Sequence, residues 1–234
     1  MKLAIMQPYF FPYVSYFQLI NAVDKFVILD DVNYINKGWI NRNRILVNGK
    51  DYLFTIPIKC SSQNKLIFEC EIADEKWKYR LLKTIEMSYK KAPFFEQSFE
   101  IITRIIEHND INLSNYIHNQ IKVLSDYLLI KTEIVKTSNN YCNLHLKAQD
   151  KIIDICKKEN AKIYINAFGG QKLYTKEIFT QNEIELKFIA TYPLNYKQFN
   201  NDYIIYLSII DMMMFNSQQS IINFLTQYDL VSNE

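Results

Sequence analysis

The sequence predicts an α/β fold, with a mostly parallel sheet that begins in a Rossmann-like βαβ unit and carries a β-hairpin and a helical insertion. Three observations predict it: short apolar runs that alternate with helical periodicity, one Asn-Gly pair between apolar alternations, and a long central stretch of helical periodicity. We expect a single α/β domain over residues 1–234, with residues 74–130 as a helical insertion or subdomain within it.

The N-terminal residues predict the βαβ unit. Residues 2–6 and 25–29 are short apolar runs typical of buried strands, and residues 13–23 between them carry apolar side chains at helical spacing. Two apolar strands joined by a helix usually lie parallel, so we expect the sheet to start here.

A hairpin and then the insertion follow. Residues 44–47 and 51–58 flank Asn48-Gly49, a pair that accepts the positive φ angles of a tight hairpin turn. From residue 74 to about 129 apolar residues recur at helical spacing, and Pro93 ends the first of these helices.

The rest of the chain returns to alternating strands and helices. We expect strands at 133–136, 162–165 and 185–190, helices at 146–159 and 176–181, and a helical tail over 208–228.

Composition excludes several classes of function. The chain has 4 glycines in 234 residues, where average usage of roughly 7% would give about sixteen. It contains neither a G-x-G-x-x-G loop nor a G-x-x-x-x-G-K-[ST] loop, so we expect no dinucleotide cofactor and no P-loop chemistry. The net charge of +2 gives no general attraction to nucleic acid, which we do not expect as a partner.

Neither a metal site nor a membrane span is predicted. The 4 cysteines and 3 histidines show no zinc-ligand spacing, and free thiols fit a reducing cytosol. Gln7, Pro8 and Pro12 interrupt the apolar start, and no run approaches the roughly 18 apolar residues of a transmembrane helix. We expect a cytoplasmic protein.

Candidate ligand-binding residues follow the first predicted strand, because open α/β sheets bind ligands beyond the carboxyl ends of their strands. A loop stiffened by two prolines joins this strand to the next helix and is rich in aromatic residues. We predict that four side chains of this segment form a stacking platform for a flat ligand: Gln7, Tyr9, Tyr13 and Tyr16. The alternative is that the aromatics are core, which is the preferred interpretation for Phe10, Phe11 and Phe17.

The second predicted strand ends in Asp30 and Asp31. A carboxylate there is suited to act as a general base toward an amine or hydroxyl. Adjacent residues on a strand point to opposite faces, so we expect at most one of the two in a given pocket. The alternative is a pair that caps a turn.

The segment from Lys37 to Arg44 contains a cluster suited to an anion. If the chain is extended here, Arg42 and Arg44 share one face, and two guanidiniums on one face suit a diphosphate or carboxylate. Trp39 adds a stacking surface and Asn41 adds hydrogen-bonding capacity. The alternative is that these are surface arginines on an edge strand.

The fourth candidate segment contains the only consecutive glycines. Gly169 and Gly170 follow the strand that ends near Asn166, and such a turn can direct backbone N–H groups at an anion. In a chain with so few glycines the pair predicts a steric requirement. It can also be a simple connection.

Taken together, these segments resemble the WbqC-like family. The resemblance rests on residues 7–20, 24–31 and 38–44, on Gly169-Gly170 with Leu173-Tyr174, and on residues 208–211. It implies a cytoplasmic role in making or decorating an unusual sugar of O-antigen or another surface polysaccharide, and a proposal for the family is transfer of glycine or a similar acyl group to an amino sugar. Ser15 stands where relatives commonly have glycine, which predicts a slightly tighter pocket.

Residues and resemblance together suggest an N-acyl or aminoacyl transferase that modifies a nucleotide-linked amino sugar. The arginines would hold the diphosphate of the sugar nucleotide, the aromatic side chains would hold its base, and Asp30 or Asp31 would accept the proton of the amine. The reaction needs an activated acyl donor or ATP. The alternatives are a metal-dependent glycosyltransferase and a non-catalytic binding protein of a polysaccharide assembly complex. The oligomeric state is left open.

Overall fold

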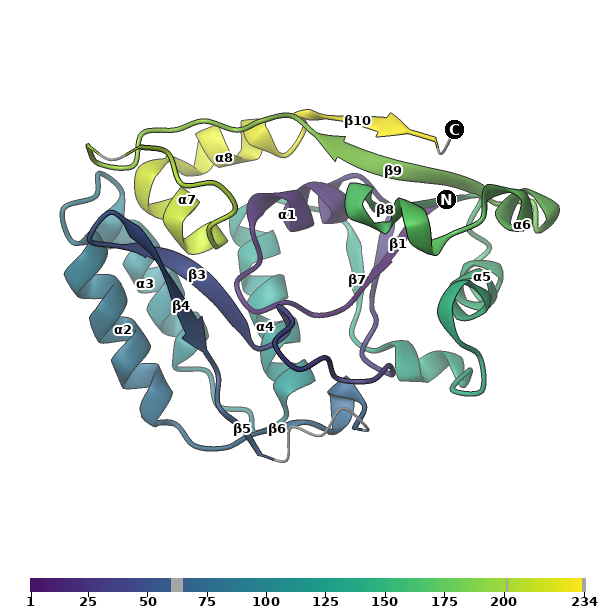
Figure 1. Cartoon of the computed structure of the whole chain (residues 1–234), viewed down its shortest axis with the longest axis horizontal. Helices are drawn as coiled ribbons and strands as arrows, with labels where there is room; N and C mark the ends of the chain where they lie inside the picture. Colours follow the sequence, from purple (N-terminus) through teal and green to yellow (C-terminus); the bar gives the residue numbers. More distant parts are fainter. Residues whose placement is uncertain (60–64, 201, 233–234) are drawn as a thin grey trace.

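A six-stranded sheet forms the centre of the structure, a computed structural model that describes residues 1–59, 65–200 and 202–232 (Figure 1). Its strands lie in the order β10-β9-β8-β1-β2-β7. All neighbouring strands are parallel except β10, which runs antiparallel to β9. The bounds are β1 Lys2–Met6, β2 Lys25–Ile28, β7 Glu133–Val135, β8 Ile163–Ala167, β9 Glu185–Thr191 and β10 Tyr228–Val231. The predicted mostly parallel α/β fold is confirmed.

The N-terminal βαβ unit lies at the middle of this sheet. Helix α1 (Val14–Asn21) joins β1 to β2, and the two strands pair in parallel from Leu3↔Lys25 onward. From β1 the chain first builds outward through β2 and β7, and it later returns to the other side of β1 with β8 and β9. The strand order therefore reverses between β1 and β8, and ligands of open α/β sheets bind at the carboxyl ends of the strands beside such a reversal.

Both faces of the sheet are buried, as expected for parallel strands. Leu3, Ile5 and Val27 pack in one core cluster with helices α5 (Ala148–Lys158) and α6 (Lys176–Gln181). The alternate residues Ala4 and Phe26 pack in a second cluster with α1 and the insertion helices. Two helical layers thus enclose the sheet and leave its carboxyl edge to the loops.

The predicted hairpin is confirmed. Strands β3 (Arg42–Val47) and β4 (Lys50–Thr55) form a separate antiparallel pair, and the turn residues Asn48 and Gly49 have φ angles of 51° and 75°. The short strands β5 (Ile58–Lys59) and β6 (Glu71–Ile72) form a further pair.

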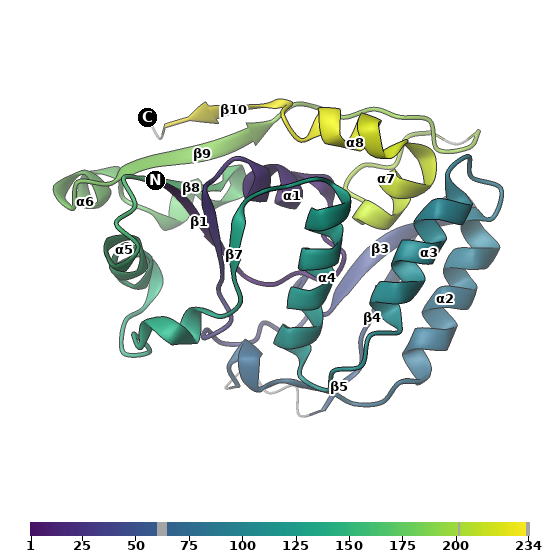
Figure 2. The ribbon, with the colours of Figure 1, turned by 180° about the vertical axis from the view of Figure 1, so that it is seen from behind.

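The insertion consists mainly of three helices, which are α2 (Lys76–Tyr89), α3 (Phe95–Ile106) and α4 (Leu113–Tyr127). Seen from behind, α4 lies between β7 and the α2–α3 pair (Figure 2). The buried side chains of all three helices belong to the same core cluster as α1. The insertion is therefore packed onto the face of the sheet that α1 covers.

The predicted helical tail is correct only as far as Phe224. Helices α7 (Ile209–Phe215) and α8 (Gln218–Phe224) form, but the chain then becomes strand β10. Gln18 of α1 donates hydrogen bonds to the carbonyls of Phe224 and Gln227 (2.8 and 3.1 Å). These bonds satisfy backbone carbonyls at and just beyond the C-terminal end of α8. Pairing with the free edge of β9 then stabilises the extended conformation.

Candidate ligand-binding site

The aromatic turn after β1 is clamped between the hairpin and the insertion. The amide of Phe10 donates to the carbonyl of Ile40 (3.1 Å), and Asn43 Nδ2 donates to the carbonyls of Phe10 and Phe11 (3.1 and 2.9 Å). From the other side, Gln120 Oε1 of α4 accepts from the amide of Phe11 (2.8 Å). Segments 7–16 and 37–44, both predicted from sequence, therefore lie against each other.

The predicted asparagine belongs to this scaffold. Asn41 is buried, accepts a hydrogen bond from the hydroxyl of Tyr34 (2.8 Å) and donates to the carbonyl of Ile56 (2.8 Å). Its amide is therefore occupied by protein groups in this arrangement.

The side chains of the aromatic turn fall into two groups, those buried in the core and those that are partly exposed. Phe10, Phe11 and Phe17 are fully buried, which confirms their interpretation as core. Tyr16 is also buried and donates to the carbonyl of Gln7 (2.9 Å), and burial raises its pKa well above the ordinary tyrosine value. Tyr16 therefore supports the turn from inside.

Gln7, Tyr9 and Tyr13 remain only partly buried. The ring of Tyr9 packs 5.6 Å from that of Tyr16. The side-chain amide of Gln7, at the end of β1, has no hydrogen-bond partner in the described part of the chain. Of this group, Tyr13 reaches a cavity.

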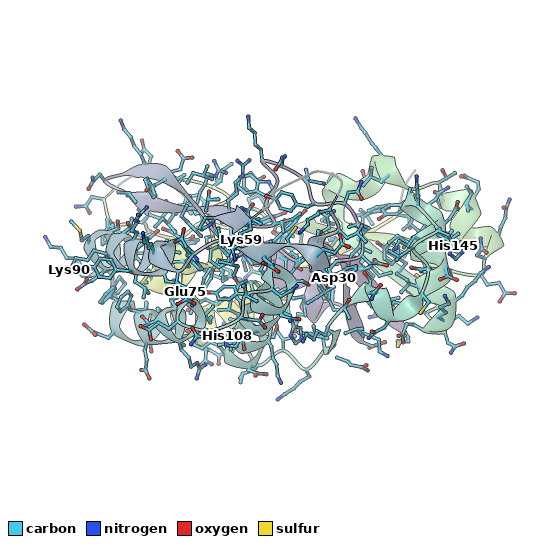
Figure 3. All side chains as sticks on the ribbon, turned by 90° about the horizontal axis from the view of Figure 1, so that it is seen from below. Asp30, Lys59, Glu75, Lys90, His108 and His145 are labelled. Atoms are coloured by element: carbon cyan, nitrogen blue, oxygen red, sulfur yellow. The ribbon has the colours of Figure 1, made fainter. Side chains whose placement is uncertain are left out.

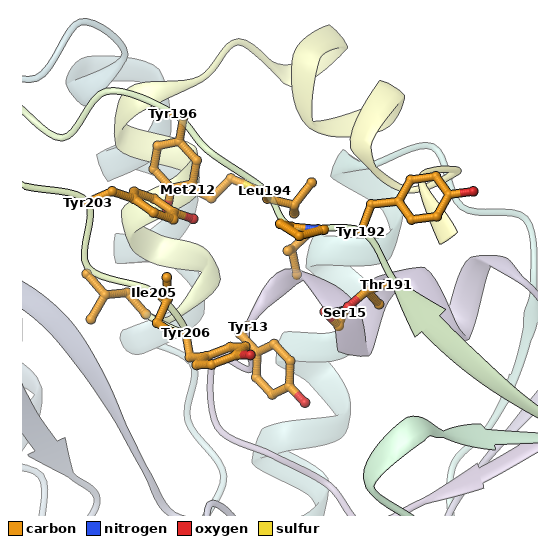
Figure 4. A pocket seen from close by; sticks show the side chains of 13 residues that line it. Tyr13, Ser15, Thr191, Tyr192, Leu194, Tyr196, Tyr203, Ile205, Tyr206 and Met212 are labelled. Atoms are coloured by element: carbon orange, nitrogen blue, oxygen red, sulfur yellow. Dashed lines mark hydrogen bonds between the residues drawn. The ribbon is translucent and has the colours of Figure 1, made fainter. Parts of the chain in front are cut away.

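A cavity of about 250 Å³ lies between the start of α1, the end of β9 and the long connection from β9 to α7. Figure 4 shows Tyr13 and Tyr206 on one side and Tyr196 and Tyr203 on another, with Met212 between that second pair and Leu194. The rings of Tyr13 and Tyr206 meet edge to face at 6.1 Å. Except for Tyr13, these tyrosines could not be predicted from sequence, because their connection shows no periodic pattern or motif.

A buried carboxylate accepts a hydrogen bond from a tyrosine in one wall of this cavity. Asp211 of α7 is 0% exposed, and its Oδ2 accepts from the Tyr196 hydroxyl (2.8 Å) and from Gln198 Nε2 (2.7 Å). Its Oδ1 accepts from the hydroxyl of Tyr89 at the end of α2 (2.8 Å). Sequence alone indicated a helix start, and Ser208 does cap α7 by accepting from the amide of Ile210 (3.2 Å). The interpretation of Ser208 to Asp211 as a helix start accounts for the position of Asp211, and its burial requires the partners that the structure supplies.

We expect Asp211 to make stability depend on pH. Burial raises its pKa from the usual 3.8, and the three donors oppose that shift without cancelling it. Above about pH 4 the unfolded state has released a proton that the folded state still holds, so the free energy of unfolding falls as pH rises through the raised pKa.

The variant Asp211→Asn tests this pH dependence. Urea unfolding between pH 4 and 7 is expected to show a flatter profile in the variant, by about 1.4 kcal/mol for each unit by which the pKa is raised. Equal slopes in both proteins would contradict the effect.

The arginine pair has the shared face that the sequence predicted. The guanidinium carbons of Arg42 and Arg44 lie 5.7 and 5.5 Å from the ring centroid of Trp39, which is 40% exposed. Arg42 donates to the carbonyls of Gly38 (2.8 Å) and Lys37, and Arg44 pairs with Asp51 (3.1 Å). Lys37 itself is exposed with a φ of 61°.

The hairpin adjoins the aromatic cavity. The amide of Ser208 donates to the carbonyl of Arg44 (2.9 Å), and the preceding residue, Leu207, lines the cavity. The arginine-bearing strand and the cavity wall are therefore neighbouring segments.

Asp30 and Asp31 lie in a buried polar network. Each is 2% exposed. Asp30 accepts from Ser114 Oγ (2.6 Å) of α4 and from Thr137 Oγ1 (2.7 Å), whereas Asp31 forms an ion pair with Lys151 Nζ (2.7 Å) of α5. Both carboxylates also accept from the Ser138 hydroxyl, so the two side chains meet in one network.

This network lies inside the molecule. Figure 3 shows Asp30 near the middle of the long axis, between Lys90 at one end and His145 at the other. Burial raises the pKa of Asp30, and the hydrogen bonds that it accepts oppose the shift. Neither Asp30 nor Asp31 lines the aromatic cavity.

The glycine pair at the end of β8 has one steric requirement, not two. A Cβ at Gly170 would lie 3.1 Å from Asn166 Oδ1, whereas a Cβ at Gly169 would meet open space. Asn166 is buried and donates to the hydroxyls of Tyr164 (2.7 Å) and Tyr174 (2.8 Å). The close approach that Gly170 permits is therefore to Asn166 of the chain itself.

The chain matches the WbqC-like protein family over residues 7–223. It belongs to this family. It is also 26% identical over 215 residues to a Mycobacterium tuberculosis protein described as uncharacterized protein Rv1507c, and the match covers 91% of this chain and 92% of that one. No solved structure matches the chain. The segment that matches the family includes the aromatic cavity, the arginine pair and Asp211.

The described part of this WbqC-like protein has no candidate metal centre. No group of three or more His, Cys, Asp or Glu side chains there could hold a metal ion. Cys70, Cys142 and Cys156 are free thiols, and Cys60 lies outside the described residues. None of the helices described is both long and apolar enough to cross a membrane.

Proposed function

We propose that this WbqC-like protein is a cytoplasmic transferase that binds a nucleotide-linked amino sugar and joins an acyl or aminoacyl group to its amine. The observation that carries the proposal is the aromatic cavity at the carboxyl edge of the sheet, directly beside the hairpin that carries Arg42 and Arg44. Aromatic walls suit a sugar ring or a base, and paired guanidiniums suit a diphosphate.

The size of the cavity indicates that it encloses only part of the proposed ligand. At about 250 Å³ it lies below the roughly 300–1,000 Å³ of pockets that enclose whole drug-sized ligands. One ring therefore occupies the cavity, and the remainder of a sugar nucleotide lies outside it. We assign the diphosphate and base to the half-exposed face of Trp39 with its two guanidiniums, since the backbone of Arg44 contacts Ser208 next to the cavity.

The reaction requires that a proton leave the amine. The amine nitrogen forms a bond to the acyl carbon, the bond from that carbon to the leaving group breaks, and the ammonium proton passes to a base. A general base lies within about 2.6–3.2 Å of the nitrogen it deprotonates. For Asp30 or Asp31 to fill this role, the substrate amine must replace one of the protein donors that now occupy the carboxylate.

In the arrangement described here, Asp30 and Asp31 act as positioning groups. They connect the end of β2 to Ser114 of α4 and to Lys151 of α5. This connection fixes the loop that follows β2, which is not part of the cavity lining.

The experiment combines product detection with binding. The purified chain is incubated with nucleotide-linked amino sugars and with acyl donors, including amino acids with ATP, and the amide product is sought by mass spectrometry. A product with the mass of the acylated sugar nucleotide is expected. Absence of both product and calorimetric binding across the panel would contradict the proposal.

We expect Arg44→Gln to weaken binding of the nucleotide sugar about tenfold or more, because a charge-assisted hydrogen bond contributes about 1.5–3 kcal/mol. Titration calorimetry measures this change. Arg80→Gln on the exposed surface of α2 is the matched control and should leave the affinity unchanged. Equal affinities of the two variants would contradict the proposal that the arginine pair binds the nucleotide sugar.

A further inference from the structure

The described lining of the aromatic cavity favours a positive charge over a negative one. Five of the lining residues are tyrosines, and no Lys, Arg or His lines the part that the structure describes. The face of an aromatic ring attracts a cation, and a tyrosine hydroxyl oxygen accepts hydrogen bonds. The cavity therefore differs from the neighbouring surface at Trp39, where Arg42 and Arg44 favour an anion.

Two pairs of these tyrosines form corners of the cavity. The rings of Tyr13 and Tyr206 stand at 77° to each other, and those of Tyr196 and Tyr203 stand at 74° with their centroids 5.1 Å apart (Figure 4). Steeply inclined rings can surround a small group from two sides, as in the aromatic cages that bind ammonium ligands. Both corners also carry hydroxyl oxygens, which can accept the hydrogens of an ammonium group.

A buried carboxylate lies directly behind one of these corners. Asp211 is 0% exposed and accepts from the hydroxyls of Tyr196 and Tyr89 and from Gln198 Nε2. The oxygen of Tyr89 accepts from the amide of Leu46 (2.7 Å), so its own proton points to Asp211. A carboxylate that accepts from every partner has the hydrogen-bond pattern of the ionised form.

This carboxylate has no cationic partner among the described residues. None of the ion pairs in that part of the chain includes Asp211, although buried charges in proteins are usually paired. Its influence extends to the cavity: burial raises the pKa of Tyr203, the hydrogen bond with Tyr196 opposes that shift, and the charge of Asp211 adds to it. A cation in the cavity would supply the opposite charge that Asp211 lacks.

We propose that the aromatic cavity binds the ammonium group of the amino sugar, with the diphosphate at the arginine pair. This inference rests on the proposed function and places the amine of its substrate. Cavity and arginine pair then match the positive amine and the negative diphosphate of one ligand. Sugars whose nitrogen is already acylated are disfavoured, because an amide carries no charge. Neither Asp30 nor Asp31 lines the cavity, so the inference leaves both as positioning groups.

The experiment compares matched nucleotide sugars in which an amine replaces one hydroxyl. Titration calorimetry at about pH 7, where such amines are largely protonated, is run with UDP-glucosamine and UDP-glucose, and with dTDP-4-amino-4,6-dideoxyglucose and dTDP-6-deoxyglucose. The amino member of at least one pair is expected to bind about threefold or more tightly, and its N-acetylated form should lose that gain.

The outcomes separate this inference from the proposed function. A smaller difference in both pairs, or an equal gain for the N-acetylated form, would overturn the inference and leave nucleotide-sugar binding standing. Failure of every ligand to bind would overturn both.

Substitutions test whether the cavity causes the preference for the amine. Asp211→Asn keeps the size of the side chain and removes its charge, and Tyr206→Leu removes a ring that is 63% exposed. Each is expected to lower the preference at least about twofold. Asp229→Asn is the matched control, because Asp229 also accepts from a cavity tyrosine, Tyr192 (2.9 Å), but is exposed, so that water screens its charge.

The control variant should keep the full preference. Retention of that preference in both Tyr206→Leu and a folded Asp211→Asn variant would overturn the inference. If Asp211→Asn does not fold, Tyr206→Leu decides alone, because its exposed side chain is not part of the core.

Discussion

Replacement of Lys151 by methionine is expected to lower the free energy of unfolding by about 3–5 kcal/mol at neutral pH. Lys151 Nζ lies 2.7 Å from Asp31 Oδ2, and the two side chains are only 4% and 0% exposed. Lys151 also donates to the carbonyl of Asp31 (3.3 Å). Without the ammonium group, Asp31 is a buried charge with no cation, and it shares Ser138 with a second carboxylate, Asp30. Urea unfolding measures the loss.

Two companion variants separate the ion pair from general effects of the substitution. Lys158→Met removes a partly exposed ion pair to Asp154 on the same helix and a hydrogen bond to the carbonyl of Tyr141 (2.7 Å), and should change stability by no more than about 2 kcal/mol. Asp31→Leu combined with Lys151→Met removes both charges and should recover at least half of the loss. A loss below about 1 kcal/mol in Lys151→Met alone would show that the pair does not hold β2 to α5.

The second large effect is expected for Asn43→Ala, which should lower the free energy of unfolding by about 3 kcal/mol. Asn43 is buried, donates to the carbonyls of Phe10 and Phe11, and accepts from the amide of Arg44 (2.8 Å). Its removal leaves three backbone groups without this partner, two of them in the aromatic turn. Denaturant unfolding and ligand titration are the measurements.

Loss of Asn43 should also weaken ligand binding, because the aromatic turn leads directly to Tyr13 at the cavity. Asn140→Ala, at an exposed position, is the control and should change stability by less than about 0.5 kcal/mol. If Asn43→Ala unfolded with the stability of the unchanged protein, the clamp on the aromatic turn would be refuted.

Much of the fold could be predicted from local patterns. Apolar runs and helical periodicity identified the βαβ start, and Asn48-Gly49 identified the hairpin, because these signals depend on neighbouring residues. Strand β10 was missed because its conformation depends on the free edge of β9 and on Gln18, which is distant in sequence. A short segment with mixed polarity takes the structure that its tertiary neighbours stabilise.

The candidate site was predicted less completely. The aromatic turn and the Lys37–Arg44 segment were each predicted as candidates from their residue types, and the structure shows that they lie against each other. Sequence alone did not distinguish the scaffold residues Asn41 and Tyr16 from the cavity residue Tyr13, because all three have polar or amphipathic side chains near the predicted carboxyl edge of the sheet.

By itself, the sequence determined the alternation of strands and helices up to Phe224 in outline, the hairpin turn, the shared face of Arg42 and Arg44, and the absence of the two glycine-rich nucleotide loops. Only the tertiary structure decided which polar residues face a cavity and which face each other. Asp30 meets Ser114, Asp31 meets Lys151 and Asp211 meets Tyr89 across 84, 120 and 122 positions of sequence. Contacts of this range arise because burial forces each polar group to find a partner wherever the packed core places one.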